Sequence, residues 1–291
     1  MALSAALIWS TATLVSTGPN TKLGAIGFNR IRMIFVFLLL GITALITGGW
    51  ETINSANLFL LILSGFIGIF LGDTFLFYTL DRVGPRRNSI LFSMAAPIAL
   101  FLNFFFLHHA IGMISLIGCF GVVTGVIIAI IYGKQASQLH IWERVKKPLW
   151  IGVVTGLLAA TAQATGIILA KPVMESGVDP IAASALRVGV AAILLIIMGR
   201  FPIKFFQSRS KADSKTIIMT CFSGFLGMAV GMTLLLLALK DGDAGIVTTL
   251  SSTIPIMVLP LIWLKTKQRP AGPAWLGAFV AVIGICLIFN F

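Results

Sequence analysis

The stretch that decides the fold is SGFIGIFLGDTFLFYTL at residues 64–80, because it returns as SGFLGMAVGMTLLLLAL at residues 223–239. The two stretches share 8 of 17 residues at an offset of 159 positions. With a gap of one residue the correspondence continues into the next helix, where Pro97 pairs with Pro255, and then into a glycine-rich helix. Glycines and prolines that recur in the same order over three helices indicate an internal duplication.

Hydrophobic residues surround both copies of the repeat. They make up 58% of the 291 residues, whereas charged residues make up 10%, against about 25% in a typical soluble protein. The mean hydropathy of +1.04 leaves too little polar surface to cover a soluble domain. Strand-like alternation is absent, so the sequence predicts an all-α membrane protein and excludes soluble enzymes and disordered chains.

Clusters of charged and turn residues divide the chain into ten predicted transmembrane helices. They cover residues 3–17, 31–49, 58–80, 89–107, 112–132, 149–170, 180–199, 216–239, 244–264 and 274–291. The repeat unit is therefore five helices, with a first half at residues 1–132, a cytoplasmic linker loop at 133–148 and a second half at 149–291. Because five is odd, the second half enters the membrane from the opposite side, and inverted repeats of this kind are typical of transporters.

The sequence resembles the drug/metabolite transporter superfamily, specifically the ten-helix carriers built from two EamA-type halves. Residues 64–100 and 223–257 carry the resemblance, and each is followed by the glycine-rich fifth helix of its half. It implies alternating access and a small-molecule substrate, such as an amino acid or an amphipathic drug, most often exported. One departure is that the Glu usual after the fourth helix is replaced by LHH at residues 107–109 and by KTK at residues 265–267.

The net charge of +12 arises from 21 Lys and Arg against 9 Asp and Glu. These basic residues lie in short loops, so they indicate membrane topology rather than a nucleic-acid partner. The loops after predicted helices 1, 3, 5, 7 and 9 carry 16 of them, and the other loops carry 2. The positive-inside rule then places both termini outside a prokaryotic cytoplasmic (inner) membrane, whereas the family resemblance implies that both termini lie inside.

Asp73 is an acidic residue well inside a predicted helix. A carboxylate is costly in hydrocarbon, so we expect Asp73 to face the bundle interior and either to pair or to be protonated. One hypothesis is that it couples transport to protons or binds a cationic substrate group. The alternative is a structural partnership with Arg30, Arg32 or Arg187. Its repeat mate is Met232, so the duplication is asymmetric here.

Other polar residues inside apolar runs are candidates for lining a substrate cavity. Arg32 and Arg187 fall at matching points of the two halves. Each either extends its charge toward the membrane interface or holds an anionic group such as a carboxylate. Gln163 lies inside the first helix of the second half. Trp9 and Thr13 share a face of the first helix, and a Trp beside polar groups suits a small, partly apolar ligand. Trp9 could equally anchor the helix at the membrane interface.

Two prolines are predicted to lie in the middle of helices. Pro97 and Pro255 each follow a serine by four residues, Ser93 and Ser251 respectively. A proline in a helix interior frees a carbonyl group and kinks the helix. We therefore expect hinges at the prolines, with the two hydroxyls facing a cavity, or kinks that serve helix packing without touching a ligand.

Rival functions find less support. An intramembrane aspartyl protease carries a G-x-G-D motif and a second membrane Asp, but Phe70 replaces the first Gly here and no other Asp lies mid-span. The sequence lacks the repeated carboxylates that would indicate an ion channel. A flippase for a lipid or lipid-linked carrier remains the alternative to a metabolite carrier.

No cofactor and no metal site are expected. An ATP-binding motif is absent, so the driving force must be an ion gradient or the substrate's own gradient. The pair His108 and His109 fits a solvated turn. Glycines at helical spacing, such as Gly118 and Gly125, favour either close helix packing or a homodimer contact.

Overall fold

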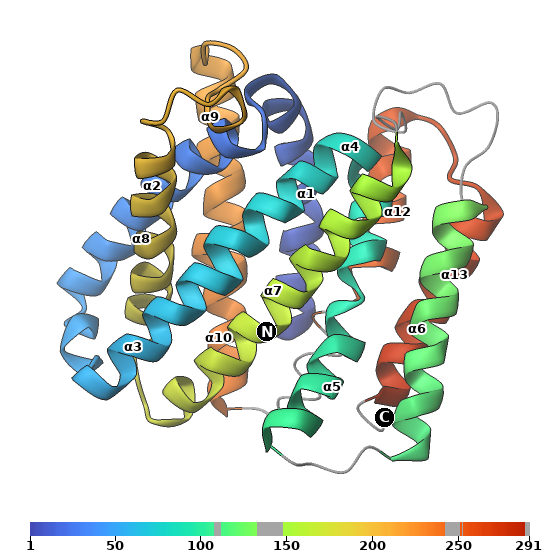
Figure 1. Ribbon diagram of the computed structural model, residues 1–291, viewed down its shortest axis with the longest axis horizontal. Coiled ribbons are helices and arrows are strands. Elements are labelled where there is room, and N and C mark those ends of the chain that lie inside the picture. Colours follow the sequence, from blue (N-terminus) through green and yellow to red (C-terminus); the bar gives the residue numbers. More distant parts are fainter. Residues whose placement is uncertain (108–111, 133–147, 242–250, 252, 289–291) are drawn as a thin grey trace.

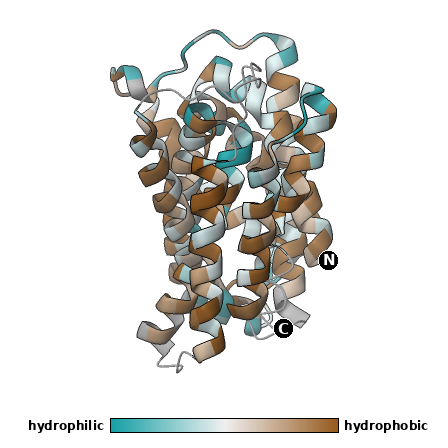
Figure 2. Cartoon of the chain, turned by 90° about the vertical axis from the view of Figure 1, so that its right-hand side faces the viewer, coloured by the Kyte–Doolittle hydropathy of each residue, from teal (hydrophilic) through white to brown (hydrophobic). Residues whose placement is uncertain are grey.

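The computed structural model describes residues 1–107, 112–132, 148–241, 251 and 253–288. Within these ranges the regular structure is helical throughout, and no strand occurs. The helices run alongside one another in one bundle (Figure 1). Apolar residues cover their lengths, and many of the hydrophilic residues gather in the connections at one end (Figure 2).

The described helical elements follow one another along the chain, and short π and 3-10 segments are labelled η. They are α1 (Ala2–Leu23), α2 (Ala25–Ile46), η1 (Gly49–Thr52), α3 (Ser55–Ser64), η2 (Gly65–Leu71), α4 (Gly72–Phe92), α5 (Ala95–Leu107), α6 (Met113–Ile131), α7 (Leu149–Glu175), α8 (Pro180–Met198), η4 (Lys204–Phe206), α9 (Ser214–Gly224), η5 (Phe225–Met232), α10 (Thr233–Asp241), α12 (Ile254–Thr266) and α13 (Gly272–Ile288).

Several of these helices can cross a membrane. In the described part of the chain, 6 are long and apolar enough by length and composition, and α12 and α13 are shorter apolar helices. The all-α membrane fold agrees with the sequence, whereas the predicted number of ten spans is not established by this count. One reason is that α3, η2 and α4 count as one span of 38 residues, although the helix is kinked at Gly84.

The first predicted break lies in the wrong place. Residues 18–20 read as a turn, yet α1 continues through Pro19 to Leu23. Asn20 does not form a turn because it is buried and its Nδ2 donates a hydrogen bond to the carbonyl of Phe77, 2.8 Å away. The chain turns instead at Gly24, whose φ of 78° suits a residue without a Cβ.

The sequence predicts a break between two helices at residues 81–88, but in the structure only Gly84 departs from helical geometry there. Gly84 has φ 81° and ψ 169° inside α4, and helical structure resumes at once and continues to Phe92. The side chains that follow Gly84, such as Asn88 and Ser89, therefore project from a helix rather than from a loop.

The mid-helix placement of the two prolines is wrong. The chain turns at Ser93, so Pro97 lies in the first turn of α5, and Pro255 is the second residue of α12. Proline is tolerated in a first helical turn, because the N–H group that it lacks has no partner there.

The two copies of the repeat share a local distortion. Wider π-helical turns occupy η2 in the first copy and η5 in the second. The repeated sequence thus adopts the same uncommon conformation twice, and such π segments are frequent at functional sites.

Helix packing links the two parts of the chain. The helix α1 contacts α9 and η5, while α7 contacts α3, η2 and α4, and α2 packs on α8. The predicted first helix of each half therefore packs against the third helix of the other half. This crossed arrangement brings α1, α4 and α7 around the centre of the bundle (Figure 1).

The glycines of α6 and α13 pack these two helices tightly together. A Cβ added at Gly118 would lie 2.5 Å from the carbonyl oxygen of Gly284, and one at Gly125 would lie 2.5 Å from that of Gly277. The expectation of close packing is confirmed within the chain, and a homodimer contact stays a prediction.

Candidate functional site

A cavity with about 650 Å³ of empty volume lies at the centre of the bundle. Side chains from α1, α2, α4, α7, η5 and α12 line it, so both predicted halves contribute. An adjoining cavity of about 550 Å³ shares five lining residues with it, namely Trp9, Ser89, Phe92, Gln163 and Ile254. We treat the two as one site, the central cavity.

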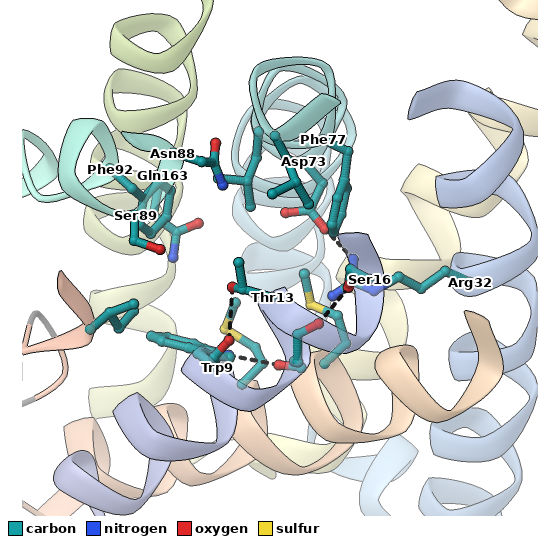
Figure 3. Close-up of a pocket in the computed structure, with 17 residues that line it drawn as sticks. Trp9, Thr13, Ser16, Arg32, Asp73, Phe77, Asn88, Ser89, Phe92 and Gln163 are labelled. Carbon is teal, nitrogen blue, oxygen red and sulfur yellow. Dashed lines mark hydrogen bonds and ion pairs between the residues drawn. The ribbon is translucent and has the colours of Figure 1, made fainter. Parts of the chain in front are cut away.

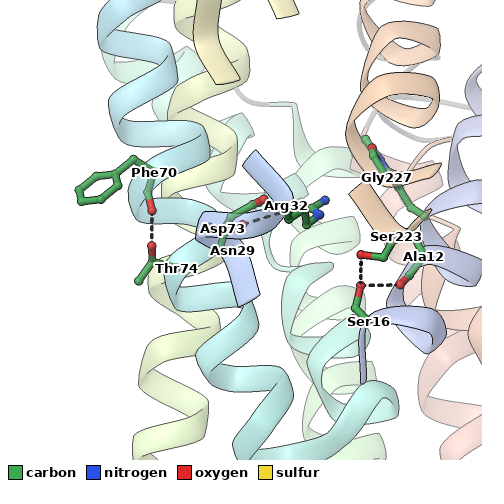
Figure 4. A network of polar contacts seen from close by, with 10 residues as sticks. Ala12, Ser16, Asn29, Arg32, Phe70, Asp73, Thr74, Ser223 and Gly227 are labelled. Atoms are coloured by element: carbon green, nitrogen blue, oxygen red, sulfur yellow. Dashed lines mark hydrogen bonds and ion pairs between the residues drawn. The ribbon is translucent and has the colours of Figure 1, made fainter. Parts of the chain in front are cut away.

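An ion pair lies on the wall of the central cavity. The Arg32 Nη1 is 2.6 Å from the Asp73 Oδ2, and the two side chains are 5% and 7% exposed (Figures 3 and 4). The guanidinium also lies over the Phe77 ring at 4.8 Å and 3.4 Å from the Asn29 Oδ1. A charged pair in an apolar interior needs such close partners, because each charge has lost its hydration. The expectation that Asp73 pairs is confirmed for Arg32.

Arg187 lies close to the central cavity but is not among its lining residues. It is 1% exposed, and its Nη1 donates to the Met232 Sδ at 3.8 Å. Its Nε and Nη2 have no hydrogen-bond partner in the described part of the chain. The buried guanidinium speaks against a side chain extended to the membrane interface.

Arg32 and Arg187 occupy corresponding places in the two copies. A Cβ at Gly224 would lie 3.0 Å from the Arg32 Cγ, and a Cβ at Gly65 would lie 2.8 Å from the Arg187 Cα. Each arginine thus packs on the first glycine of the repeat motif in the other half, as the suggested correspondence predicts. The copies differ at Asp73, where the second half has Met232.

Trp9 is an interior residue rather than an interfacial anchor. It lines both parts of the cavity, and its Nε1 donates to the Gly227 carbonyl in η5 at 2.7 Å. Thr13 lies one turn along α1, also lines the cavity and donates to the Trp9 carbonyl at 2.9 Å. Figure 3 shows the Trp9 side chain opposite the Arg32–Asp73 pair.

Two amides offer unused hydrogen-bonding groups to the cavity. Gln163 on α7 lines both parts and makes no hydrogen bond within the described part of the chain. The Asn88 Oδ1 is buried without a partner there. Sequence reasoning missed Asn88 because the charges before it suggested a loop, and the helix-compatible residues after Gly84 were the signal that could have found it.

The predicted serines line the second part of the cavity, but one proline does not. Ser93, Ser251 and Pro255 contribute to its wall, and the Ser93 Oγ donates to the Ile90 carbonyl at 2.6 Å. Pro97 is not among the lining residues. The cavity therefore brings together every predicted binding residue except Arg187.

The connection at residues 199–213, called the strap below, ties the second half to the first. The Arg209 Nη2 is 2.7 Å from the Asp81 Oδ2 of α4, and the Lys22 Nζ of α1 is 2.8 Å from the Asp213 Oδ1. The Arg209 backbone N–H also donates to the last carbonyl of α1 at 3.0 Å. The strap thus joins the end of α1 to the middle of α4, and both helices line the cavity.

Among the described residues, no group of three or more His, Cys, Asp or Glu could hold a metal ion. The predicted turn with His108 and His109 lies outside the described residues.

One of the comparisons with known proteins identifies a family. The sequence profile of the EamA-like transporter family matches residues 1–131 and 150–290. No curated protein matches the chain. A solved structure described as "Crystal structure of protein" is similar, with a TM-score of 0.67 and 15% identity over 98% of this chain and 94% of that one. At this identity the structural likeness shows the fold alone.

Proposed function

The chain belongs to the EamA-like transporter family of the drug/metabolite transporter superfamily, and from this premise we propose that it is a secondary active transporter of small metabolites or amphipathic drugs. Membership makes it a multi-pass membrane transporter. The observation that carries the finer proposal is the central cavity between residues 1–132 and 149–291, lined by both halves. Export is the proposed direction, by family resemblance.

We propose alternating access between the two halves as the mechanism. The crossed packing of α1 on η5 and of α7 on η2 supports it, because two similar sets of contacts can exchange conformations. The proposed hinges are Pro97 and Pro255, which lie in the first turns of α5 and α12. In this mechanism, the strap contacts of Asp81 and Asp213 would have to break when the cavity opens at that end.

Asp73 is the proposed coupling residue. It is an acidic residue of the cavity wall, and its carboxylate is held by Arg32. Protonation of Asp73 would remove its charge and release the guanidinium of Arg32. Proton binding would therefore change the charge seen by a substrate in the same cavity, which is what coupling requires.

Counterflow in proteoliposomes tests the proposal. Purified protein is given a panel of amino acids, nucleosides, organic acids and cationic drugs, with and without a pH gradient. Exchange of any water-soluble compound supports a metabolite carrier, and loss of the pH response in Asp73→Asn supports coupling. The matched control is Glu175→Gln, a carboxylate that is 60% exposed and away from the cavity.

The opposite outcomes are equally defined. If Asp73→Asn keeps full proton-driven transport, the coupling role is wrong. If folded protein exchanges no compound of the panel, a flippase for a lipid or lipid-linked carrier becomes the better hypothesis, and labelled lipids in the same vesicles then test it.

A further inference from the structure

The buried charges next to the central cavity do not balance. Arg32, Arg187 and Asp73 lie in contact with the cavity or with one residue of its wall. Asp73 pairs with Arg32 at 2.6 Å. The cluster therefore holds one carboxylate for two guanidinium groups, and neither guanidinium gives up its proton in a protein. This charge cluster carries one excess positive charge.

The excess charge follows from the asymmetry of the duplication. In the first half Arg32 faces Asp73, whereas in the second half Arg187 faces Met232 at the equivalent place. A thioether is a weak acceptor and carries no charge. Two nitrogens of Arg187 have no hydrogen-bond partner in the described part of the chain. A cation buried in this way is costly until an anion approaches it.

The side chain of Met232 links this cation to the cavity. Met232 contacts the Arg187 Nη1 and also lines the cavity. Methionine is unbranched and adapts its conformation, so it can move aside at little cost. The guanidinium also lies against η2, since a Cβ at Gly68 would lie 3.4 Å from the Arg187 Nη2.

The cavity wall has a charged side and an aromatic side. Figure 3 shows Arg32 and Asp73 at one side, with Trp9, Phe92 and Gln163 at the other. Resting on the transport function proposed above, we propose that the substrate is an organic monoanion whose carboxylate lies toward Arg187 and whose apolar body lies against Trp9 and Phe92. One excess charge matches a monoanion. A zwitterion or a cation leaves the excess in place or adds to it.

Binding to the purified protein in detergent tests the charge of the substrate without any transport. The probes are 3-phenylpropionate, the neutral 3-phenylpropionamide and 3-phenylpropylammonium, which share a ring and a chain. The expected result is that the carboxylate binds about tenfold more tightly than the amide, which corresponds to about 1.4 kcal/mol, and that the ammonium binds most weakly. Equal binding of the three probes, tightest binding of the ammonium, or binding of none overturns the proposal.

Variants with opposite effects separate a charge effect from a structural one. Arg187→Gln and Met232→Asp each remove the excess charge and should abolish the preference for the carboxylate. Asp73→Asn adds one positive charge and should increase it. Arg200→Gln, at an exposed position, is the matched control. A preference that Met232→Asp leaves intact in folded protein contradicts the assignment, even if Arg187→Gln does not fold.

The two proposals fail in different ways. If the carboxylate binds selectively but counterflow detects no transport of it, the transporter proposal is weakened and the anion site stands. If counterflow instead carries cations or zwitterions and the carboxylate does not bind, the transporter proposal stands and the anion site is wrong.

Discussion

At the scale of single residues, the Arg32–Asp73 pair joins α2 to α4 in the centre of the bundle. Removing one partner leaves the other charge buried and uncompensated, whereas removing both leaves neutral side chains. We expect Arg32→Gln to lower the free energy of unfolding by about 3–5 kcal/mol, and the double variant Arg32→Gln/Asp73→Asn to recover part of that loss. Thermal or denaturant unfolding in detergent measures both.

An exposed ion pair provides the control for this prediction. Lys171 and Glu175 are 3.8 Å apart on α7, with side chains 42% and 60% exposed. Exposed pairs contribute about 0–1 kcal/mol, so the same double-mutant cycle on them should give a small coupling. A coupling at Arg32–Asp73 no larger than this would mean that the buried pair is hydrated.

Trp9 links the cavity wall to η5 through its hydrogen bond to the Gly227 carbonyl. Trp9→Phe keeps an aromatic ring but leaves that carbonyl without its donor, so we expect a loss of about 1 kcal/mol of stability and weaker binding of an aromatic substrate. The control is Trp150→Phe, since Trp150 is 63% exposed. Unfolding and ligand-binding titrations compare the two variants, and equal effects would contradict the assigned role of Trp9.

At the scale of helices, α6 and α13 depend on glycine for their close contact. A Cβ at Gly284 would lie 2.5 Å from the Val122 nitrogen and 2.6 Å from the Gly118 oxygen, both of which are rigid backbone atoms. We expect Gly284→Ala to lower the unfolding free energy by about 1–3 kcal/mol, because the helices must separate. The melting temperature in detergent measures the effect.

A glycine with free space around it gives the matched comparison. A Cβ at Gly18 meets nothing within 4 Å, and Gly18 lies inside α1. Gly18→Ala should therefore leave stability unchanged or raise it by up to about 1 kcal/mol, through helix propensity. If Gly284→Ala behaves like Gly18→Ala, the close packing of α6 and α13 is not a requirement of the fold.

The helix ends explain which parts of the structure the sequence could predict. The periodicity and the repeat predict the helices, the pairing of Asp73 and the matching places of Arg32 and Arg187. The extension of α1 through Pro19 could not be predicted, because a hydrogen bond from Asn20 to a distant helix overrides the local turn signal. A proline in sequence, such as Pro97, shows only that a kink or a helix start is near.

The same limit applies to the site. Trp9, Thr13 and Gln163 were found because polar or aromatic groups inside apolar helices stand out in a sequence. Asn88 was missed because its role depends on how narrowly the chain breaks at Gly84. The burial of Arg187 behind Met232 depends on a contact between α8 and η5, which no local pattern contains.

At the scale of the whole molecule, the contacts of the strap indicate which end of the helix bundle faces the cytoplasm. The pairs Arg209–Asp81 and Lys22–Asp213 join the segments that follow predicted helices 1, 3 and 7. The segments that follow these three predicted helices therefore meet at one end of the bundle. Basic residues near the ends of transmembrane helices are retained in the cytoplasm, so we place this end there.

Reporter fusions decide the orientation. The loops after predicted helices 1, 3, 5, 7 and 9 carry 16 Lys and Arg, and the other loops carry 2. With the basic loops in the cytoplasm, both termini are predicted to lie outside the inner membrane. Alkaline phosphatase fused after Phe291 should be active and green fluorescent protein dark at the same point. The matched control is a fusion truncated after Lys211, in the strap, where the fluorescent reporter should light up. A fluorescent fusion after Phe291 would reverse the orientation, because the charge bias would then lie on the outer face. In that case both termini would lie inside, as the family resemblance implies, and the positive-inside rule would not hold for this chain.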